Sequence, residues 1–299
     1  MRGGVVAVTG ATGFIGSHLV PLLSSRGWKV RAVVRKPQVE MPPGVEIKRA
    51  DLLDPPSLFS ALEGAQAAYY LVHSMEGERD SKFAERDRQA AENFKGAAEQ
   101  AGVGRIIYLG GLGEVRPGIS EHLRSRTEVG RILSSGPIPV TTLRAAIILG
   151  PGGASWEMLR QLVERLPVMV TPRWLETHCQ PIALRDALGY LAGCLDSQDT
   201  KGGSFDIGGP DIMTYREMMQ TLAEILRKRR CIIPIPVLTP RLSSYWVNLV
   251  TDVPAALASP LIEGLKNEVI CRENRIRELI PIPLTPYRDA VRMALAGKV

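Results

Sequence analysis

Residues 5–16 of the chain, VVAVTGATGFIG, decide the fold. The first five are β-branched or small and almost all apolar, which is typical of a buried strand in a parallel sheet. Three glycines then follow at a spacing of three, and leucines recur at helical spacing directly after them. A strand, a glycine-rich turn and a helix in this order predict the first unit of a doubly wound α/β fold.

The three glycines have separate physical roles in such a turn. Gly10 permits the tight turn, Gly13 lets the backbone approach a pyrophosphate, and Gly16 lets the helix and strand pack closely. Unpaired N–H groups at the start of the helix attract anionic oxygens. We therefore predict nucleotide binding here, with a purely structural turn as the alternative, and the expected contact residues are Gly10, Thr12, Gly13, Phe14, Ile15 and Gly16.

The rest of the first half alternates short β-branched runs with longer helical patterns, as βαβ units do. Strands are expected near residues 4–9, 28–34, 45–49, 66–72, 105–110 and 139–144, and helices near 14–26, 56–63, 79–102 and 119–135. Pro21 lies inside the first helical pattern and is expected to kink or shorten that helix. The predicted fold class is α/β, a Rossmann doubly wound parallel sheet with a smaller C-terminal α+β substrate domain.

The alternation ends after Gly150, where prolines become frequent. We expect a dinucleotide-binding Rossmann domain in residues 1–150 and a smaller substrate domain in residues 151–299, part of which can return to the Rossmann sheet. The basic run 227–230 is expected to close a helix. The apolar, proline-rich segment 234–265 either packs the small domain onto the sheet, or forms a wall of a substrate pocket or a membrane-surface patch. Further helices are expected near 154–165, 185–196 and 215–230, separated by the apolar runs 168–170 and 232–236.

The composition is that of a compact globular protein, because 45% hydrophobic and 23% charged residues in a chain of 299 exclude wholesale disorder. The net charge of +6 is not concentrated in one block, so nucleic acid is not an expected partner, whereas small anionic ligands are. The start of the chain shows no leader pattern, and no apolar stretch is long enough to span a membrane. These features predict a cytoplasmic protein, monomeric or homodimeric, with peripheral membrane contact as the closest approach to a lipid bilayer.

The four cysteines are too far apart in sequence for a zinc or redox pair. No metal site is expected, and we interpret Cys179, Cys194, Cys231 and Cys271 as reduced core residues.

The end of the second predicted strand selects between the two nicotinamide cofactors. A carboxylate there would hold the ribose 2′-hydroxyl of NAD, but this chain has Arg35 and Lys36. A guanidinium binds a 2′-phosphate with two parallel hydrogen bonds, so NADP(H) is favoured over NAD(H). Asp51, with Leu52 beside it, follows the third strand and is expected to accept a hydrogen bond from the adenine amino group. Asp54 is interpreted as a helix cap.

These motifs together resemble the extended or atypical short-chain dehydrogenase/reductases. The resemblance rests on the glycine spacing, the basic end of the second strand, Asp51-Leu52, and Thr142-Leu143-Arg144 followed by Gly150-Pro151-Gly152. Within this superfamily the chain is similar to NmrA-like NAD(P)H-binding proteins of the nitrogen-regulator type and to the Rossmann-type accessory subunit of respiratory complex I. The resemblance implies a bound dinucleotide, with or without turnover.

The resemblance also assigns residues to the nicotinamide end of the site. It implies that Leu71, Val72 and His73 lie beside the nicotinamide ribose. The family's serine on the fifth strand is replaced by Gly110-Gly111, and its Tyr-x-x-x-Lys aligns with His122 and Arg126. Both residues of that family pair are therefore absent.

A histidine and an arginine one helical turn apart can still support a reduction. A histidine with an ordinary pKa of ~6.5 can protonate an alkoxide, and Arg126 can hold ribose hydroxyls without relaying a proton. The leading hypothesis is an oxidoreductase that acts on a small or apolar carbonyl or alkene substrate. The alternatives are a non-catalytic NAD(P)H-binding sensor or assembly protein, and a nucleotide-sugar epimerase or dehydratase.

Overall fold

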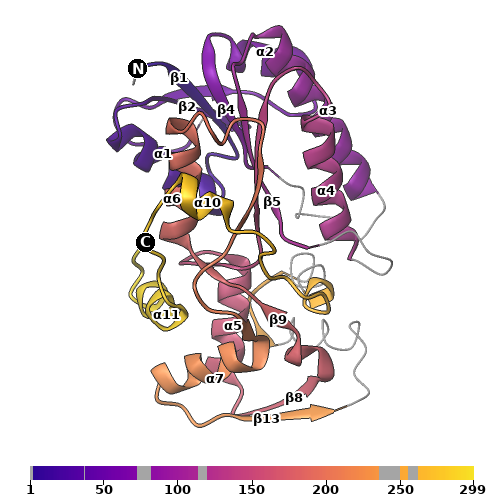
Figure 1. Ribbon diagram of the computed structural model, residues 1–299, viewed down its shortest axis with the longest axis vertical. Helices are drawn as coiled ribbons and strands as arrows, with labels where there is room; N and C mark the ends of the chain where they lie inside the picture. Colours follow the sequence, from indigo (N-terminus) through magenta and orange to yellow (C-terminus); the bar gives the residue numbers. More distant parts are fainter. Residues whose placement is uncertain (1–2, 37, 73–81, 114–119, 236–249, 255–261) are drawn as a thin grey trace.

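The computed structural model describes residues 3–36, 38–72, 82–113, 120–235, 250–254 and 262–299 (Figure 1). The chain forms two lobes, a Rossmann lobe that contains the N-terminus and a smaller lobe below it in Figure 1. A cavity described in the next subsection lies where the two meet.

The Rossmann lobe is built on a seven-stranded sheet in the order β11-β6-β5-β4-β1-β2-β3, in which every pair is parallel. Its first six strands along the chain are β1 (Val5–Thr9), β2 (Lys29–Val34), β3 (Glu46–Arg49), β4 (Ala65–Tyr70), β5 (Ile106–Gly111) and β6 (Val140–Ala145). The strand order reverses between β1 and β4, whose carboxyl ends lie side by side because Thr9 pairs with Tyr70. In parallel sheets a ligand crevice forms at such a reversal.

Helices cover both faces of the sheet. The helices α1 (Phe14–Ser25) and α6 (Leu184–Asp196) cover one face, and α2 (Pro55–Leu62), α3 (Lys82–Gln100) and α4 (Glu121–Leu133) cover the other. Alternate residues of β1 point to opposite faces: Val6 and Val8 pack in the α1/α6 layer, and Ala7 packs in the α2/α3/α4 layer. The Tyr69 hydroxyl donates to the carbonyl of Leu191 at 2.8 Å and ties α6 to the sheet.

The sequence prediction of an α/β doubly wound sheet is confirmed, and all six expected strands lie within two residues of their expected bounds. The seventh strand, β11 (Ser204–Ile207), was not predicted. It pairs with β6, so Ser204 lies opposite Thr142, and part of the second half of the chain belongs to the Rossmann sheet. Pro21 does not shorten α1, which continues to Ser25 with Pro21 on its exposed side.

In the described part of the smaller lobe there are three two-stranded sheets with helices packed against them. Its strands are β7 (Ile148–Leu149), β8 (Val168–Pro172), β9 (His178–Cys179), β10 (Ile182–Ala183), β12 (Met213–Thr214) and β13 (Cys231–Ile235). Its helices are α5 (Ala154–Arg165), the short η1 (Arg173–Glu176), α7 (Tyr215–Ile225) and α11 (Tyr287–Leu295), while α10 (Arg275–Leu279) packs beside β11. Trp156, Met218 and Val291 are among the residues of its common core.

Two expectations for this half need correction. Helix α7 ends at Ile225, not near residue 230, and Arg227 has a left-handed φ of 54°, so the basic run follows the helix. Cys179 and Cys194 are buried as expected, but Cys231 is exposed and Cys271 is only partly buried; all four are free thiols. Within the described ranges no helix has the length and apolar character needed to cross a bilayer, and no cluster of residues there is suited to hold a metal ion.

Candidate dinucleotide and substrate site

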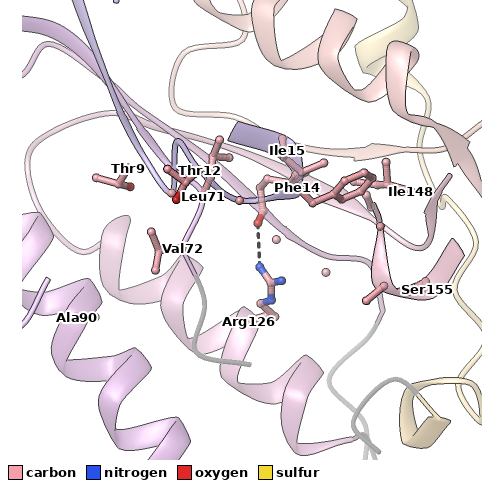
Figure 2. Close-up of a pocket in the computed structure, with 18 of the residues that line it drawn as sticks. Thr9, Thr12, Phe14, Ile15, Leu71, Val72, Ala90, Arg126, Ile148 and Ser155 are labelled. Atoms are coloured by element: carbon pink, nitrogen blue, oxygen red, sulfur yellow. Dashed lines mark hydrogen bonds between the residues drawn. The ribbon is translucent and has the colours of Figure 1, made fainter. Parts of the chain in front are cut away.

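A cavity of about 880 Å³ lies at the carboxyl ends of β1, β2, β4, β5 and β6 and extends into the smaller lobe. Figure 2 shows its central part, with the β1–α1 turn on one side and α4 on the other. The crevice therefore forms where the strand order reverses, and residues from both lobes line it.

The β1–α1 turn forms one wall of this cavity. Gly10 has a φ of 71°, and the Gly13 N–H donates to the Gly10 carbonyl at 2.9 Å. A Cβ on Gly16 would lie 2.1 Å from the Gly10 carbonyl oxygen and 2.7 Å from the Ala11 Cα, so only glycine allows this packing of α1 against the turn.

The start of α1 is open to an anion. Its N-cap residue is Gly13, no side chain caps it, and its first turn carries no acidic residue. The backbone N–H groups of that turn therefore have no side-chain acceptor, which is the arrangement that binds a phosphate. The residues of this region fit the pyrophosphate of a dinucleotide.

Five of the six loop residues predicted to contact the cofactor line the cavity: Gly10, Thr12, Gly13, Phe14 and Ile15. Figure 2 labels Thr12, Phe14 and Ile15 among them. Gly16 does not line it, because it packs behind the turn.

The end of the cavity at β2 and β3 carries charged side chains. Arg35 and Asp51 both line it, and Leu52 lies beside Asp51. One carboxylate oxygen of Asp51 accepts the backbone N–H of Leu53 at 2.9 Å, which fixes the side chain in this loop. Lys36 is exposed and does not line the cavity. Asp54 is the N-cap residue of α2 but makes no side-chain capping hydrogen bond.

A second arginine, Arg86 on α3, also lines this end of the cavity, and sequence reasoning missed it. Ala90, one turn further along α3, lines the same wall. Neither Arg35 nor Arg86 has a hydrogen-bond or ion-pair partner among the side chains that the structure describes. Two cations that form no ion pair with any described residue therefore face the part of the cavity where a nucleotide phosphate would lie. One feature of the sequence could have pointed to Arg86: it lies four residues before Ala90, so the two residues share one face of α3.

The end of β4 provides Leu71 and Val72, which both line the cavity (Figure 2). His73 lies outside the described residues. Gly110 and Gly111 end β5 and also line the cavity. A Cβ on Gly110 would lie 3.0 Å from the Tyr108 ring, and one on Gly111 would lie 2.9 Å from a methyl of Leu123. A serine side chain at either position would displace these neighbours.

The backbones of His122 and Arg126 lie one turn apart on α4. The side chain of His122 is outside the described part of the chain. Arg126 lines the cavity, and its Nη1 donates to the carbonyl of Leu109 at 3.2 Å. Its Nε is buried without a described partner. Arg126 is therefore held at the end of β5 with donor capacity left for a ligand (Figure 2).

Tyr108 is near this point but does not replace the missing family tyrosine. Its hydroxyl donates to the backbone carbonyl of Arg126 at 2.9 Å, and burial raises its pKa. A phenol that is buried and already bonded in this way is a structural group.

The end of the cavity in the smaller lobe is apolar, and we call it the apolar chamber. It is lined by Leu112, Leu123, Ile147, Ile148, Met158, Leu265 and Val269, with Ser155 and Tyr215 as the side chains that carry hydroxyls. Burial raises the pKa of Tyr215. Among the described residues that line the cavity, the charged ones are Arg35, Asp51, Arg86 and Arg126, and all four lie outside the apolar chamber. Most of segment 234–265 is not described, but Gly264 and Leu265 do line the cavity wall.

Comparisons with known proteins agree with this geometry. Residues 10–137 match a family described as NAD(P)H-binding. The chain is 31% identical to a ceramide reductase of Caulobacter vibrioides over 56% of its own length, and it spans about half (53%) of that protein. It is 24% identical to the mitochondrial NADH dehydrogenase [ubiquinone] 1 alpha subcomplex subunit 9 of Arabidopsis thaliana, over 96% of this chain and 77% of that subunit.

The triphenylmethane reductase of Citrobacter sp., solved in complex with NADP(H), has the same fold. Its structure superposes with a TM-score of 0.75 at 22% identity, and the match covers 97% of this chain and 99% of the reductase.

Fold, turn and comparisons together define a dinucleotide-binding Rossmann protein. Residues 10–137 therefore resemble NAD(P)H-binding proteins, and the chain as a whole has the fold of the solved reductases.

Proposed function

We propose that this protein is an NADP(H)-dependent oxidoreductase that reduces an uncharged, apolar carbonyl or alkene substrate. One observation carries the proposal: a single cavity joins the phosphate-binding turn to the apolar chamber. A dinucleotide that begins at Arg35 and crosses the β1–α1 turn would end beside Arg126, at the entrance to this chamber. The described lining of the chamber supports this substrate class, since it offers no counter-ion to a charged group.

Residues of the Rossmann lobe would hold the cofactor, which supplies the hydride when bound. Arg35, with Lys36 and Arg86 nearby, would bind the 2′-phosphate, and Asp51 and Leu52 would contact the adenine. The β1–α1 turn would bind the pyrophosphate through its N–H groups. Leu71, Val72, His73 and Gly110 would contact the nicotinamide ribose.

The protein itself would position the cofactor, shield the reacting carbon from water, and protonate the substrate's carbonyl oxygen. Arg126 would hold a ribose hydroxyl, and the apolar chamber would exclude water from the reacting carbon. His122 would donate a proton to the carbonyl oxygen as the hydride arrives at the carbon, so a ketone becomes an alcohol. The histidine then takes up a proton from solvent.

A non-catalytic NAD(P)H-binding sensor or assembly protein is the second candidate. Gly110 and Gly111 favour it, because neither supplies the hydroxyl of a polarising serine, and a Cβ on Gly110 would be in tight contact with the Tyr108 ring. The similarity to an NADH dehydrogenase subunit points the same way. Nucleotide-sugar epimerisation or dehydration is less favoured, because the described lining of the apolar chamber offers no cation for a sugar diphosphate. We also propose that the protein is related to NmrA-like proteins, that it is located in the cytoplasm, and that it is a monomer or a homodimer.

The cofactor assignment is tested by calorimetric titration of NADPH and NADH into the wild type and an Arg35→Asp variant. We expect the variant to bind NADPH about 10- to 100-fold more weakly, since a charge-assisted hydrogen bond contributes ~1.5–3 kcal/mol, and to bind NADH nearly unchanged. Lys29→Asp, at the opposite end of β2, is the matched control. Equal losses for both cofactors would refute the NADP assignment.

Turnover is tested by following NADPH oxidation with a panel of quinones, apolar ketones and enones. An oxidoreductase consumes NADPH with at least one class of compound. Tight NADPH binding with no consumption across the panel would favour the second candidate.

A further inference from the structure

The two-stranded sheet β8/β13 lies at the end of the smaller lobe remote from β1 (Figure 1). Its strands are parallel, and Val168 pairs with Cys231 while Val170 pairs with Ile233. Side chains alternate along each strand, so these four residues share one face. The other face carries Met169, which is buried, and Ile232, which packs on the core of the lobe.

The shared face is exposed and apolar. Val168, Val170 and Ile233 are 52%, 54% and 43% exposed, and Cys231 is exposed as well. The described part of the chain has eight exposed large aliphatic side chains, and three of them lie on this one small sheet. A contiguous apolar patch of this kind marks an interaction surface rather than ordinary surface scatter. We call it the β8/β13 face.

Cations lie at the end where both strands begin. The run Arg227-Lys228-Arg229-Arg230 directly precedes β13. The side chains of Lys228 and Arg230 each donate to the carbonyl of Glu164 at 3.0 Å, which fixes the run beside the end of α5, just before β8. Arg227 and Arg229 are exposed and have no ion-pair partner among the residues the structure describes. The β8/β13 face is therefore bordered by two cations that are available to anions.

We propose that the β8/β13 face docks on an anionic lipid surface, with Val168, Val170 and Ile233 at the acyl boundary and Arg227 and Arg229 among the headgroups. Exposed aliphatic side chains beside basic residues are the combination that binds such surfaces peripherally. A stable protein interface needs about 20–30 residues a side, far more than this sheet presents. The docking does not depend on the reaction proposed above, so the two can fail separately.

Co-sedimentation of the full-length protein with vesicles tests whether the aliphatic side chains of the β8/β13 face contribute to lipid binding. We expect binding to vesicles of mixed phosphatidylcholine and phosphatidylglycerol, little binding to phosphatidylcholine alone, and loss of binding in a Val170→Glu, Ile233→Glu double variant. Ile47→Glu, at a similarly exposed aliphatic side chain on β3 of the central sheet, is the control and should bind as the wild type does. Unchanged NADPH affinity in each variant shows that the fold is intact.

Neutralising the cations tests the electrostatic part. Arg227→Gln with Arg229→Gln should weaken the partition into anionic vesicles by about 30-fold at low salt, given ~1 kcal/mol for each basic residue near the surface. Lys201→Gln with Lys298→Gln removes the same charge elsewhere and should have little effect.

The proposal is overturned if the wild type does not bind anionic vesicles at low salt, or if folded variants of the β8/β13 face bind them as well as the wild type. It is also overturned if light scattering shows a dimer that the Val170→Glu, Ile233→Glu variant disrupts while vesicles are not bound, since a second copy is then the partner.

Discussion

The two ends of the cavity differ in chemistry although they belong to one continuous space. Arg35, Asp51 and Arg86 line the end at β2 and β3, whereas aliphatic side chains and Tyr215 line the apolar chamber. An end with two arginines that form no ion pair with the described residues suits a phosphate, and an apolar end suits an uncharged ligand. From this difference we expect the charged end to select the cofactor and the apolar chamber to select the substrate, with Arg126 between them.

The largest effect is expected at this boundary. If His122 donates the proton, His122→Ala should lower kcat for a substrate found in the NADPH panel by about 10²–10⁴-fold, because that is the usual contribution of a general acid. NADPH affinity should change little, and this separates a chemical role from a binding one. His178→Ala is the matched control, since His178 is exposed on β9. Unchanged turnover in His122→Ala would remove the proton-donor assignment.

The charged end depends on the β1–α1 turn being intact. Gly16→Ala should weaken the binding of both NADPH and NADH by about 100-fold, since backbone atoms stand within 2.7 Å of the new Cβ and α1 must move away from the turn. Gly96→Ala on α3 is the control. Its Cβ meets nothing within 4 Å, so the variant should gain up to about 1 kcal/mol in unfolding free energy. Calorimetry and thermal melts check both, and undiminished binding in Gly16→Ala would contradict the packing described here.

The apolar end should discriminate against charge. For a pair of substrates that differ by one added carboxylate, we expect kcat/KM to favour the neutral compound by about 30-fold or more, because an unpaired buried carboxylate costs several kcal/mol. Leu265→Arg should narrow that ratio by offering a counter-ion, whereas Leu279→Arg, outside the cavity, should not. A wild type that prefers the carboxylate would contradict the comparison between the two ends.

The smallest effect concerns Arg86. Arg86→Gln should weaken NADPH binding about two- to fivefold, because an exposed cation near a phosphate contributes only ~0.5–1 kcal/mol, and the loss should disappear at high salt. Arg88→Gln is the control on the same helix, since Arg88 pairs with Glu85 and Glu128. Equal effects of the two substitutions would remove Arg86 from the site.

The fold of the first half was predictable because its signals are local. Most strands there are short apolar runs bounded by turn residues, as β1, β2 and β5 show, and the glycine turn carries its geometry in three residues. Strand β11 was missed because it has only four residues and pairs with β6, which lies some sixty positions earlier in the chain. Its place in the sheet depends on a long-range contact that no short window of sequence contains.

The residues of the candidate site show the same difference between local signals and long-range contacts. Gly10, Gly13 and Arg35 could be predicted because the turn and the strand end place them directly. Arg86 and the residues of the apolar chamber could not. Helix α3 turns Arg86 toward the cavity only because its other face packs on the sheet. Met158 and Val269 reach the chamber from α5 and from a loop more than a hundred residues later.

The return of the chain to the Rossmann sheet limits how the protein can be divided. A fragment ending at residue 150 would lack β11 and α6, so the backbone of β6 would become an unpaired edge and the apolar side of α1 would lose its cover. Tyr69 would also keep a hydroxyl with no acceptor, because its partner is the carbonyl of Leu191. Such a truncation should aggregate rather than bind nucleotide. A chimaera with a different substrate lobe would have to retain residues 184–207 of this chain.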